Sequence, residues 1–266
     1  MIILTIASQK GGVGKTTVAL NLGYSLAMRN WRTLIVDTDP QGALGLSLSQ
    51  KVSAAAGLVN CLLEGATAQE VIIRTRLGAL SLLPVGRVGI DRLVAFEEAV
   101  QDGGLYDLLI GLESQFDLVI VDTAAGFGAT TIGALCAATH LLAPVQAEPV
   151  ALRSLPQLLE WVGWLRERGA ALELLGVVTT MLQRDDPNSR GVAEELWSRF
   201  PAEFILQPAI PRDPAFLEAT AVGVPVGLLS RNPPPVARIF DQLALTVEAR
   251  LGLAILGDDD GPIPLV

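Results

Sequence analysis

The residues best suited to chemistry form a glycine-rich run near the N-terminus, Ser8-Gln9-Lys10-Gly11-Gly12-Val13-Gly14-Lys15-Thr16-Thr17. An apolar segment precedes this run, and a segment with apolar residues at helical spacing follows it. A strand, a loop of the type Gly-x-x-x-x-Gly-Lys-Thr and a helix, in that order, are typical of a phosphate-binding P-loop. Glycines let backbone N–H groups turn toward phosphate oxygens, and the helix N-terminus adds favourable partial charge. The run therefore predicts a nucleotide site.

Two side chains of this loop have specific roles in the prediction. Lys15 is expected to reach the β- and γ-phosphates, and the Thr16 hydroxyl is expected to ligate Mg²⁺. The predicted cofactors are therefore ATP and Mg²⁺. The other expected cofactor contacts within the loop are Gly11, Gly12, Val13, Gly14 and Thr17.

Lys10 is a second cation in a loop that already contains a phosphate-binding lysine. It lies five residues before Lys15, and from there it does not easily fold back onto the same phosphates. It would instead be free to reach the nucleotide of a facing subunit. The simpler alternative is a solvated surface lysine.

Three carboxylates follow apolar strands and complete the predicted site. Asp37 and Asp122 each end a strand, so both should emerge beside the P-loop at the carboxyl edge of a parallel sheet. A carboxylate at that place can hold Mg²⁺ through water. Asp39 lies two residues further on, in a loop that can move with the γ-phosphate.

The motifs together resemble the deviant Walker A ATPases of the ParA/MinD family. Lys10 to Thr17 resembles that family's P-loop, Asp37-Thr38-Asp39-Pro40-Gln41-Gly42 its switch I, and Leu118-Val119-Ile120-Val121-Asp122-Thr123 its Walker B and switch II. Residues 210–226 resemble the C-terminal stretch typical of ParA proteins, so the likeness spans about residues 1–252. It implies a homodimer that sandwiches two ATP molecules, with Lys10 crossing the interface. It also implies catalytic roles for Lys10, Lys15 and Asp39, with Asp39 positioning the attacking water.

The sequence departs from that family at two places. The family usually has two prolines after the Walker B aspartate, where this chain has Ala124-Ala125-Gly126, which predicts a more flexible switch II loop. An Asn-Arg adenine motif does not follow the segment 174–179. Thr180-Met181 looks instead like the ParA variant, which implies an adenine site of apolar atoms and backbone that includes Met181 and Pro211.

The elements that must position these motifs alternate between strand and helix. Polar loops are expected at 39–42 and 183–190. Apolar runs predict strands at 2–7, 33–36, 80–83, 118–121, 140–145, 174–179 and near Ile205. Helices are expected from the P-loop to about residue 29 and at 58–63, 68–73, 91–100, 105–114, 131–137, 152–168, 192–200, 215–221 and 236–251. This alternation predicts an α/β fold, a doubly wound, mainly parallel sheet flanked by helices, as in P-loop NTPases. One domain is expected over 1–254, with an acidic, disordered tail at 255–266.

Composition limits the compartment and the partners. Half of the 266 residues are hydrophobic, as buried parallel strands require. Neither a membrane span nor a signal peptide is predicted, which favours the cytoplasm, with nucleoid association as a further expectation. The two cysteines, Cys61 and Cys136, are expected to be free core thiols. Trp161 and Trp164, at helical spacing, are interpreted as packing residues.

A net charge of −9 argues against a strongly basic nucleic-acid binder. Arginines nevertheless gather in the C-terminal third, where ParA-like proteins contact nonspecific DNA. Solvated arginines are the alternative interpretation, because Asp185, Asp186 and Asp213 lie among them. The nucleic-acid candidates are Arg184, Arg190, Arg212 and Arg231, with Arg238 nearby.

Several functions share these motifs. The preferred hypothesis is a ParA-like ATPase whose ATP dimer binds nonspecific DNA and whose hydrolysis is stimulated by a cargo-linked activating protein. A positioning ATPase for a protein assembly is not separable from it by sequence. A MinD-like membrane switch would need a basic amphipathic C-terminal helix, whereas residues 257–261 are acidic, so stable membrane binding is not expected. A nitrogenase-type reductase would need two cysteines just after the switch strands, and this chain has none so placed. A cobyrinate-synthase-like ligase would need a glutaminase domain, for which no room is expected.

Overall fold

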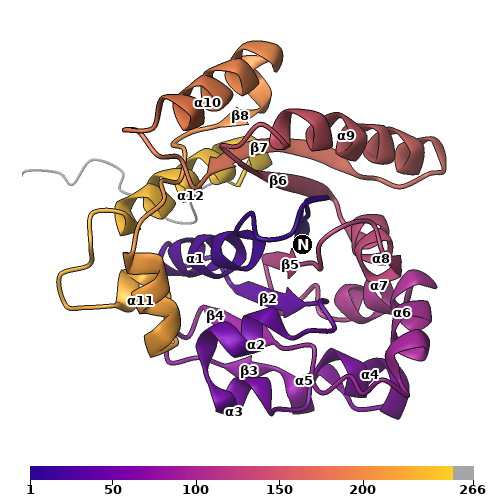
Figure 1. The fold of residues 1–266 in the computed structure, drawn as a ribbon. Coiled ribbons are helices and arrows are strands. Elements are labelled where there is room, and N and C mark those ends of the chain that lie inside the picture. Colours follow the sequence, from indigo (N-terminus) through magenta and orange to yellow (C-terminus); the bar gives the residue numbers. More distant parts are fainter. Residues whose placement is uncertain (254–266) are drawn as a thin grey trace, which may run out of the picture.

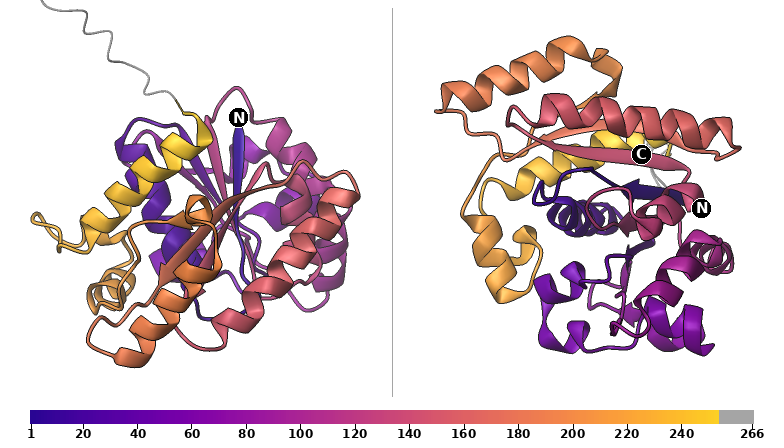
Figure 2. Two further views of the ribbon diagram at one scale, coloured as in Figure 1. Left: turned by 90° about the horizontal axis from the view of Figure 1, so that it is seen from above. Right: turned by 45° about the vertical axis from the view of Figure 1, so that its right-hand side comes forward.

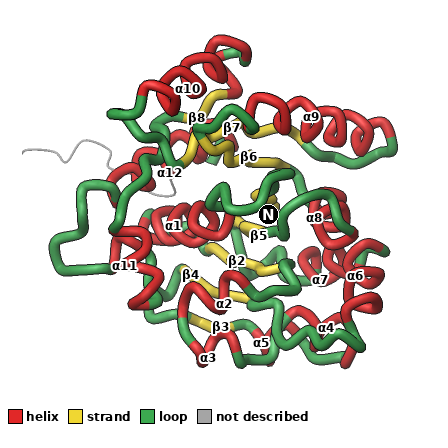
Figure 3. Tube along the Cα trace, viewed as in Figure 1, coloured by secondary structure: helices red, strands yellow, loops and turns green. Residues whose placement is uncertain are grey.

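The computed structural model describes residues 1–253 of the chain (Figures 1 and 3). Strands and helices alternate along this range and build one eight-stranded sheet with helices on both faces. The predicted acidic tail, 255–266, and the boundary at residue 254 lie outside the described residues, so both stay predictions. In the described part of the chain, no helix is long and apolar enough to cross a membrane.

The sheet has the strand order β3-β4-β2-β5-β1-β6-β7-β8. All neighbouring strands run parallel except β3, which pairs antiparallel with β4 at one edge. The fold class predicted from the sequence, a mainly parallel doubly wound sheet, is confirmed. The strands are β1 (Ile2–Ile6), β2 (Thr33–Asp37), β3 (Ile73–Arg74), β4 (Leu80–Leu83), β5 (Leu118–Asp122), β6 (His140–Gln146), β7 (Glu173–Thr180) and β8 (Ile205–Leu206).

Alternate residues of the central strands enter two apolar cores, one on each face of the sheet. On β1, Ile3 packs into one core and Leu4 and Ile6 pack into the other. Figures 1 and 2 show α6, α7 and α8 on the first side and α1, α11 and α12 on the opposite side. The helices are α1 (Lys15–Met28), α2 (Ala43–Leu48), α3 (Gln50–Ser53), α4 (Leu58–Glu64), α5 (Ala68–Val71), α6 (Leu93–Gln101), α7 (Gly104–Ile110), α8 (Ala129–Ala137), α9 (Ala151–Glu167), α10 (Pro187–Arg199), α11 (Ala215–Val222) and α12 (Ala237–Leu251), with short 3-10 turns η1 (Ala202–Phe204) and η2 (Val226–Leu228).

The register of the three central strands brings the predicted motifs together. Asp37 at the end of β2 is in register with Asp122 at the end of β5, and Asp122 is also in register with Ile6 of β1. The P-loop leaves β1 at this same edge. Because parallel strands present their carboxyl ends together, ligands bind at this edge in open α/β sheets.

The structure corrects the predicted elements at several points. Helices α2 and α3 were not expected, and the edge strand β3 ends the helix predicted at 68–73. Helix α10 begins inside the loop predicted at 183–190, because the Asp186 carboxylate accepts a hydrogen bond from the Asn188 N–H and Pro187 occupies the first helical turn. Of the two free cysteines, Cys61 is half-buried but Cys136 is exposed, so the expectation of two core thiols is wrong for Cys136.

Candidate nucleotide-binding site

The P-loop runs from β1 into the first turn of α1. Gly12 and Gly14 have φ angles of 75° and 91°, in the left-handed region that glycine adopts without a steric cost. No described side chain caps the start of α1, so the N–H groups of its first turn remain free for an anion. Gln9 stands where the general Gly-x-x-x-x-Gly-Lys-Thr pattern has its first glycine, so the loop follows that pattern only from Gly14 onward.

Lys15 is buried beneath this loop, with 8% of its surface exposed. Burial lowers the pKa of its ammonium group, while the nearby carboxylates of Asp122 and Asp39 act in the opposite direction. A buried cation at the start of a helix attracts a polyanion strongly, because little solvent screens it. The position fits the predicted contact with phosphate.

Asp122 is fully buried at the end of β5, and neither of its carboxylate oxygens has a hydrogen-bond partner of normal geometry. Burial raises its pKa from the usual 3.8 to about 7, although the Thr16 hydroxyl and the Lys15 ammonium oppose the rise. An orphaned buried carboxylate beside a threonine hydroxyl is an incomplete site for a hard cation. These donors fit Mg²⁺, which uses few protein ligands and keeps water and phosphate oxygens for the rest.

Asp37 and Asp39 shape the loop that follows β2. The two carboxylate oxygens of buried Asp37 accept hydrogen bonds from the backbone N–H groups of Asp39 (3.0 Å) and Leu44 (3.1 Å). Burial and the nearby Asp122 carboxylate raise the pKa of Asp37 well above its usual value. Asp39 is less buried, and its carboxylate accepts the N–H of Gln41 at 2.9 Å. Asp37 therefore organises the switch I loop in addition to any role toward a cation.

Lys10 does not point into the phosphate cradle of its own chain. Its Nζ atom lies 3.1 Å from Oε1 of Gln146, the last residue of β6, and 2.6 Å from Oε2 of Glu148, two residues further on. Its side chain is 31% exposed and ion-paired, so Lys10 is a surface lysine with a defined partner, and its role toward a second subunit stays a prediction. Sequence reasoning missed Gln146 and Glu148, although their place directly after a predicted strand puts them at the functional edge of the sheet.

A cavity of about 420 Å³ adjoins the P-loop at Val13 and Gly14. Met181 lies against the loop, since a Cβ placed on Gly14 would lie 3.9 Å from its Cε atom. The Thr180 hydroxyl donates a 2.8 Å hydrogen bond to the Val13 carbonyl and so ties β7 to the P-loop. The expected adenine residues, Met181 and Pro211, both line the cavity. The other lining residues include Ile210, Arg212, Asp213, Pro214, Phe216, Leu217 and Thr220, which sequence reasoning did not single out as adenine contacts.

Comparisons with known proteins agree with this geometry. A family model described as "AAA domain" matches residues 1–174. The chain is 34% identical over 230 residues to the chromosome partitioning protein ParA of Myxococcus xanthus, covering 84% of this chain and 80% of that protein. The chain belongs to the ParA/MinD family of P-loop ATPases.

Two solved structures resemble this ParA/MinD-family chain over almost its whole length. The ATP complex of a Cyanothece McdA variant has a TM-score of 0.79 at 25% identity, covering 96% of this chain and 97% of that one. A Mycobacterium smegmatis cobyrinic acid a,c-diamide synthase with bound ATP analogue and magnesium has a TM-score of 0.75 at 28% identity, covering 95% and 97%. Because this chain matches 97% of the synthase chain, lack of room for a glutaminase domain no longer argues against a cobyrinate-synthase-like ligase.

The four arginines predicted to contact DNA are all exposed, but they do not come from one element. Arg184 lies in the loop before α10 and Arg190 in its first turn, and the Arg212 backbone N–H donates to the Leu182 carbonyl, two residues before Arg184. Arg212 also lines the nucleotide cavity. Arg231 lies on a separate loop, between η2 and α12. The structure thus groups three of the four candidates.

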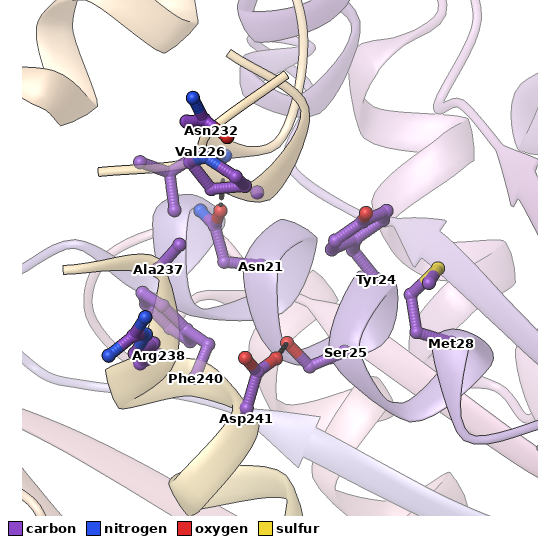
Figure 4. Close-up of a pocket in the computed structure, with 12 residues that line it drawn as sticks. Asn21, Tyr24, Ser25, Met28, Val226, Asn232, Ala237, Arg238, Phe240 and Asp241 are labelled. Atoms are coloured by element: carbon purple, nitrogen blue, oxygen red, sulfur yellow. Dashed lines mark hydrogen bonds between the residues drawn. The ribbon is translucent and has the colours of Figure 1, made fainter. Parts of the chain in front are cut away.

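A second cavity, of about 360 Å³, lies on the flank of α1 away from the phosphate loop (Figure 4). The Asn21 amide bridges two segments there: it donates to the Thr17 carbonyl at 2.8 Å and accepts the Val226 N–H at 2.7 Å. The Ser25 hydroxyl donates to the Asp241 carboxylate of α12 at 3.0 Å. These contacts fix the P-loop helix to the C-terminal segment.

Proposed function

We propose that this chain is an ATP-switched dimer that partitions or positions a cargo inside a bacterial cell. The observation that carries the proposal is the placement of two lysines in one loop. Lys15 is buried under the phosphate cradle, whereas Lys10 is held outside it by Glu148. A cation at that place is available to the nucleotide of a second subunit.

ATP and Mg²⁺ are the cofactors of this site, in keeping with the ATP complex and the ATP-analogue–magnesium complex of the similar structures. Bound MgATP supplies the phosphoryl group that passes to water. Lys15 would neutralise charge on the phosphates, and Thr16 with Asp122 would hold the cation. Asp39 would orient the attacking water, because its loop is the part of the site free to follow the γ-phosphate. The products are ADP and phosphate.

The dimer forms in this proposal when Lys10 leaves Glu148 and turns to the partner's nucleotide. The pair is partly exposed, at 31% for Lys10 and 47% for Glu148, so releasing it costs only about 0–1 kcal/mol. A contact between a cation and a triphosphate is charge-assisted and stronger than a neutral hydrogen bond. The exchange therefore favours association only when ATP is bound.

The cargo side of the proposal follows the partition relatives. The ATP dimer would bind nonspecific DNA through Arg184, Arg190 and Arg212, and an activating protein linked to the cargo would stimulate hydrolysis. The chain itself would work in the cytoplasm, in association with the nucleoid. A second candidate, positioning of a protein assembly without DNA, is favoured by the net charge of −9, which opposes binding to a polyanion.

Three variants, measured by size-exclusion chromatography with light scattering and by ATP binding, test the switch. Lys15→Ala should lose nucleotide binding. Lys10→Ala should bind ATP as a monomer but dimerise at least about 100-fold more weakly, because the symmetric dimer loses two charge-assisted hydrogen bonds, each corresponding to about 10- to 100-fold. Asp39→Ala should collect as a dimer that hydrolyses ATP slowly.

Lys51→Ala is the matched control, because it removes the only other lysine, an exposed one on α3. It should bind, dimerise and hydrolyse like the unaltered chain. Normal dimerisation of Lys10→Ala would refute the cross-subunit role and leave a nucleotide-binding protein without this switch.

A further inference from the structure

An aromatic contact joins the switch II loop to helix α9. The ring of Phe127, in the loop after β5, stacks on Trp161 with a centroid separation of 5.1 Å and an interplanar angle of 22°. Trp161 in turn meets Trp164 edge to face at 5.6 Å, and the Arg168 guanidinium lies 3.8 Å above the Trp164 ring. Trp161 and Trp164 therefore pack against each other, as their spacing predicts, although Trp164 is 42% exposed and packs at the surface.

The loop that carries Phe127 has few other restraints. Gly126 before it has a φ of 83°, and neither Gly126 nor Gly128 would meet any atom within 4 Å if it carried a Cβ. The Thr123 hydroxyl ties the start of the loop to the Ile6 carbonyl at 2.9 Å. Beyond it, the backbone has a 3.2 Å hydrogen bond from the Gly126 N–H to the Ser8 carbonyl and a long 3.4 Å bond from the Thr131 hydroxyl to the Ala124 carbonyl. Glycines on both sides of one aromatic residue leave the ring as the main anchor.

Helix α9 is also the element packed against the Lys10 loop. Lys10 is held by Gln146 and Glu148, which directly precede α9, and the first turns of α9 line a small cleft with Ser8, Gln9 and Lys10. The same helix therefore borders both parts of the site that would move when ATP binds: its first turns line a cleft with the Lys10 loop, and Trp161 contacts switch II.

We infer that Phe127 is a positioning residue for the reaction: its stack on Trp161 seats switch II against α9, so that the loop after Asp122 is held facing the nucleotide. The inference rests on the proposed ATPase function and deepens it. Phe127 directly follows the Ala124-Ala125-Gly126 run that replaces the two prolines usual in the family, so a side-chain contact takes the place of proline rigidity as the anchor. A stacked aromatic pair of this kind corresponds to about a two- to tenfold change in an equilibrium constant.

Hydrogen–deuterium exchange and steady-state kinetics on the full chain test this role. Phe127→Ala should raise amide exchange over residues 123–128 about two- to tenfold in the nucleotide-free protein. It should lower kcat by a similar factor, because a loop that is no longer anchored must be ordered in each catalytic cycle. The KM for ATP should stay within about twofold. Phe127→Tyr keeps the ring and should restore both values.

Trp164→Ala is the matched control, since it removes an aromatic ring from the same cluster that does not touch the loop. It should leave exchange at 123–128 and kcat unchanged. Equal exchange in Phe127→Ala and the unaltered protein would overturn the inference, and so would an equal effect of Trp164→Ala. The exchange measurement needs no turnover, so it decides the role of Phe127 even if the chain does not hydrolyse ATP.

Discussion

At the scale of single residues, the site is built from buried charges that lack partners. Among residues 1–253, Asp122 has no hydrogen-bond partner of normal geometry, and the buried Lys15 has the carboxylates of Asp122 and Asp39 to offset its charge. Such groups destabilise the protein until a ligand pairs with them. A triphosphate and a cation satisfy both at once, so nucleotide binding and stability should be strongly linked.

The buried carboxylate gives the first prediction, for protein kept free of metal and nucleotide. The folded pKa of Asp122, about 7, lies above its usual 3.8, so the folded state binds more protons than the unfolded state between these values. The contribution of Asp122 to the free energy of unfolding is therefore full below about pH 4 and is lost as the pH rises to about 7. Asp122→Asn should remove much of this slope and exceed the unaltered protein in stability at pH 8 by roughly 2 kcal/mol.

Urea denaturation in EDTA at pH 5 and pH 8 measures this difference. Asp117→Asn provides a control that should leave the difference between pH 5 and pH 8 unchanged, because hydrogen bonding and attraction from Arg32 lower the pKa of Asp117. The stabilisation from Asp117 is lost only as the pH falls below about 4, outside this window. If Asp122→Asn keeps the same pH slope as the unaltered chain, Asp122 is not the group that titrates.

At the scale of elements, helix α1 is held by a polar bridge as well as by its apolar face. The Asn21 amide is 4% exposed and satisfies both the Thr17 carbonyl and the Val226 N–H. Asn21→Leu should destabilise the fold by about 1–3 kcal/mol, because it leaves the Val226 N–H without its acceptor. Ser25→Ala, in the same cavity, should cost less, because its partner Asp241 is exposed and water replaces the lost donor. Thermal unfolding of the two variants compares them, and equal losses would argue against the bridge.

The elements also explain what sequence patterns reveal here and what they do not. Strands such as β5 are readable as apolar runs because both faces of a parallel sheet are covered. The two-residue strand β3 and the short helices α2 and α3 are too brief to show a period. The Lys10–Glu148 contact joins residues 138 positions apart, so no local pattern contains it. The P-loop is the opposite case, because all of its chemistry lies within one short run.

At the scale of the whole molecule, the central question is whether so acidic a chain binds DNA, as proposed. A net charge of −9 repels a polyanion at long range, so any binding must come from a local group of arginines. Arg184, Arg190 and Arg212 lie near the β8 edge of the sheet, whereas Arg74 and Arg76 lie at the opposite, β3 edge. The two groups allow the same change in net charge to be made at two distant places.

The last prediction uses this asymmetry. The ATP-bound protein should bind nonspecific duplex DNA with an affinity that falls steeply with salt, by about 0.9 in logarithmic slope for each phosphate contact. The double change Arg184→Ala with Arg190→Ala should weaken binding equally on all sequences and reduce that slope by roughly 1–2. The control pair, Arg74→Ala with Arg76→Ala, removes the same charge and should leave the slope unchanged. If both pairs weaken binding alike, only net charge matters and the β8 edge is not the DNA surface. If the unaltered protein binds no DNA in any nucleotide state, the DNA half of the proposal fails and only the ATP-dependent switch is left.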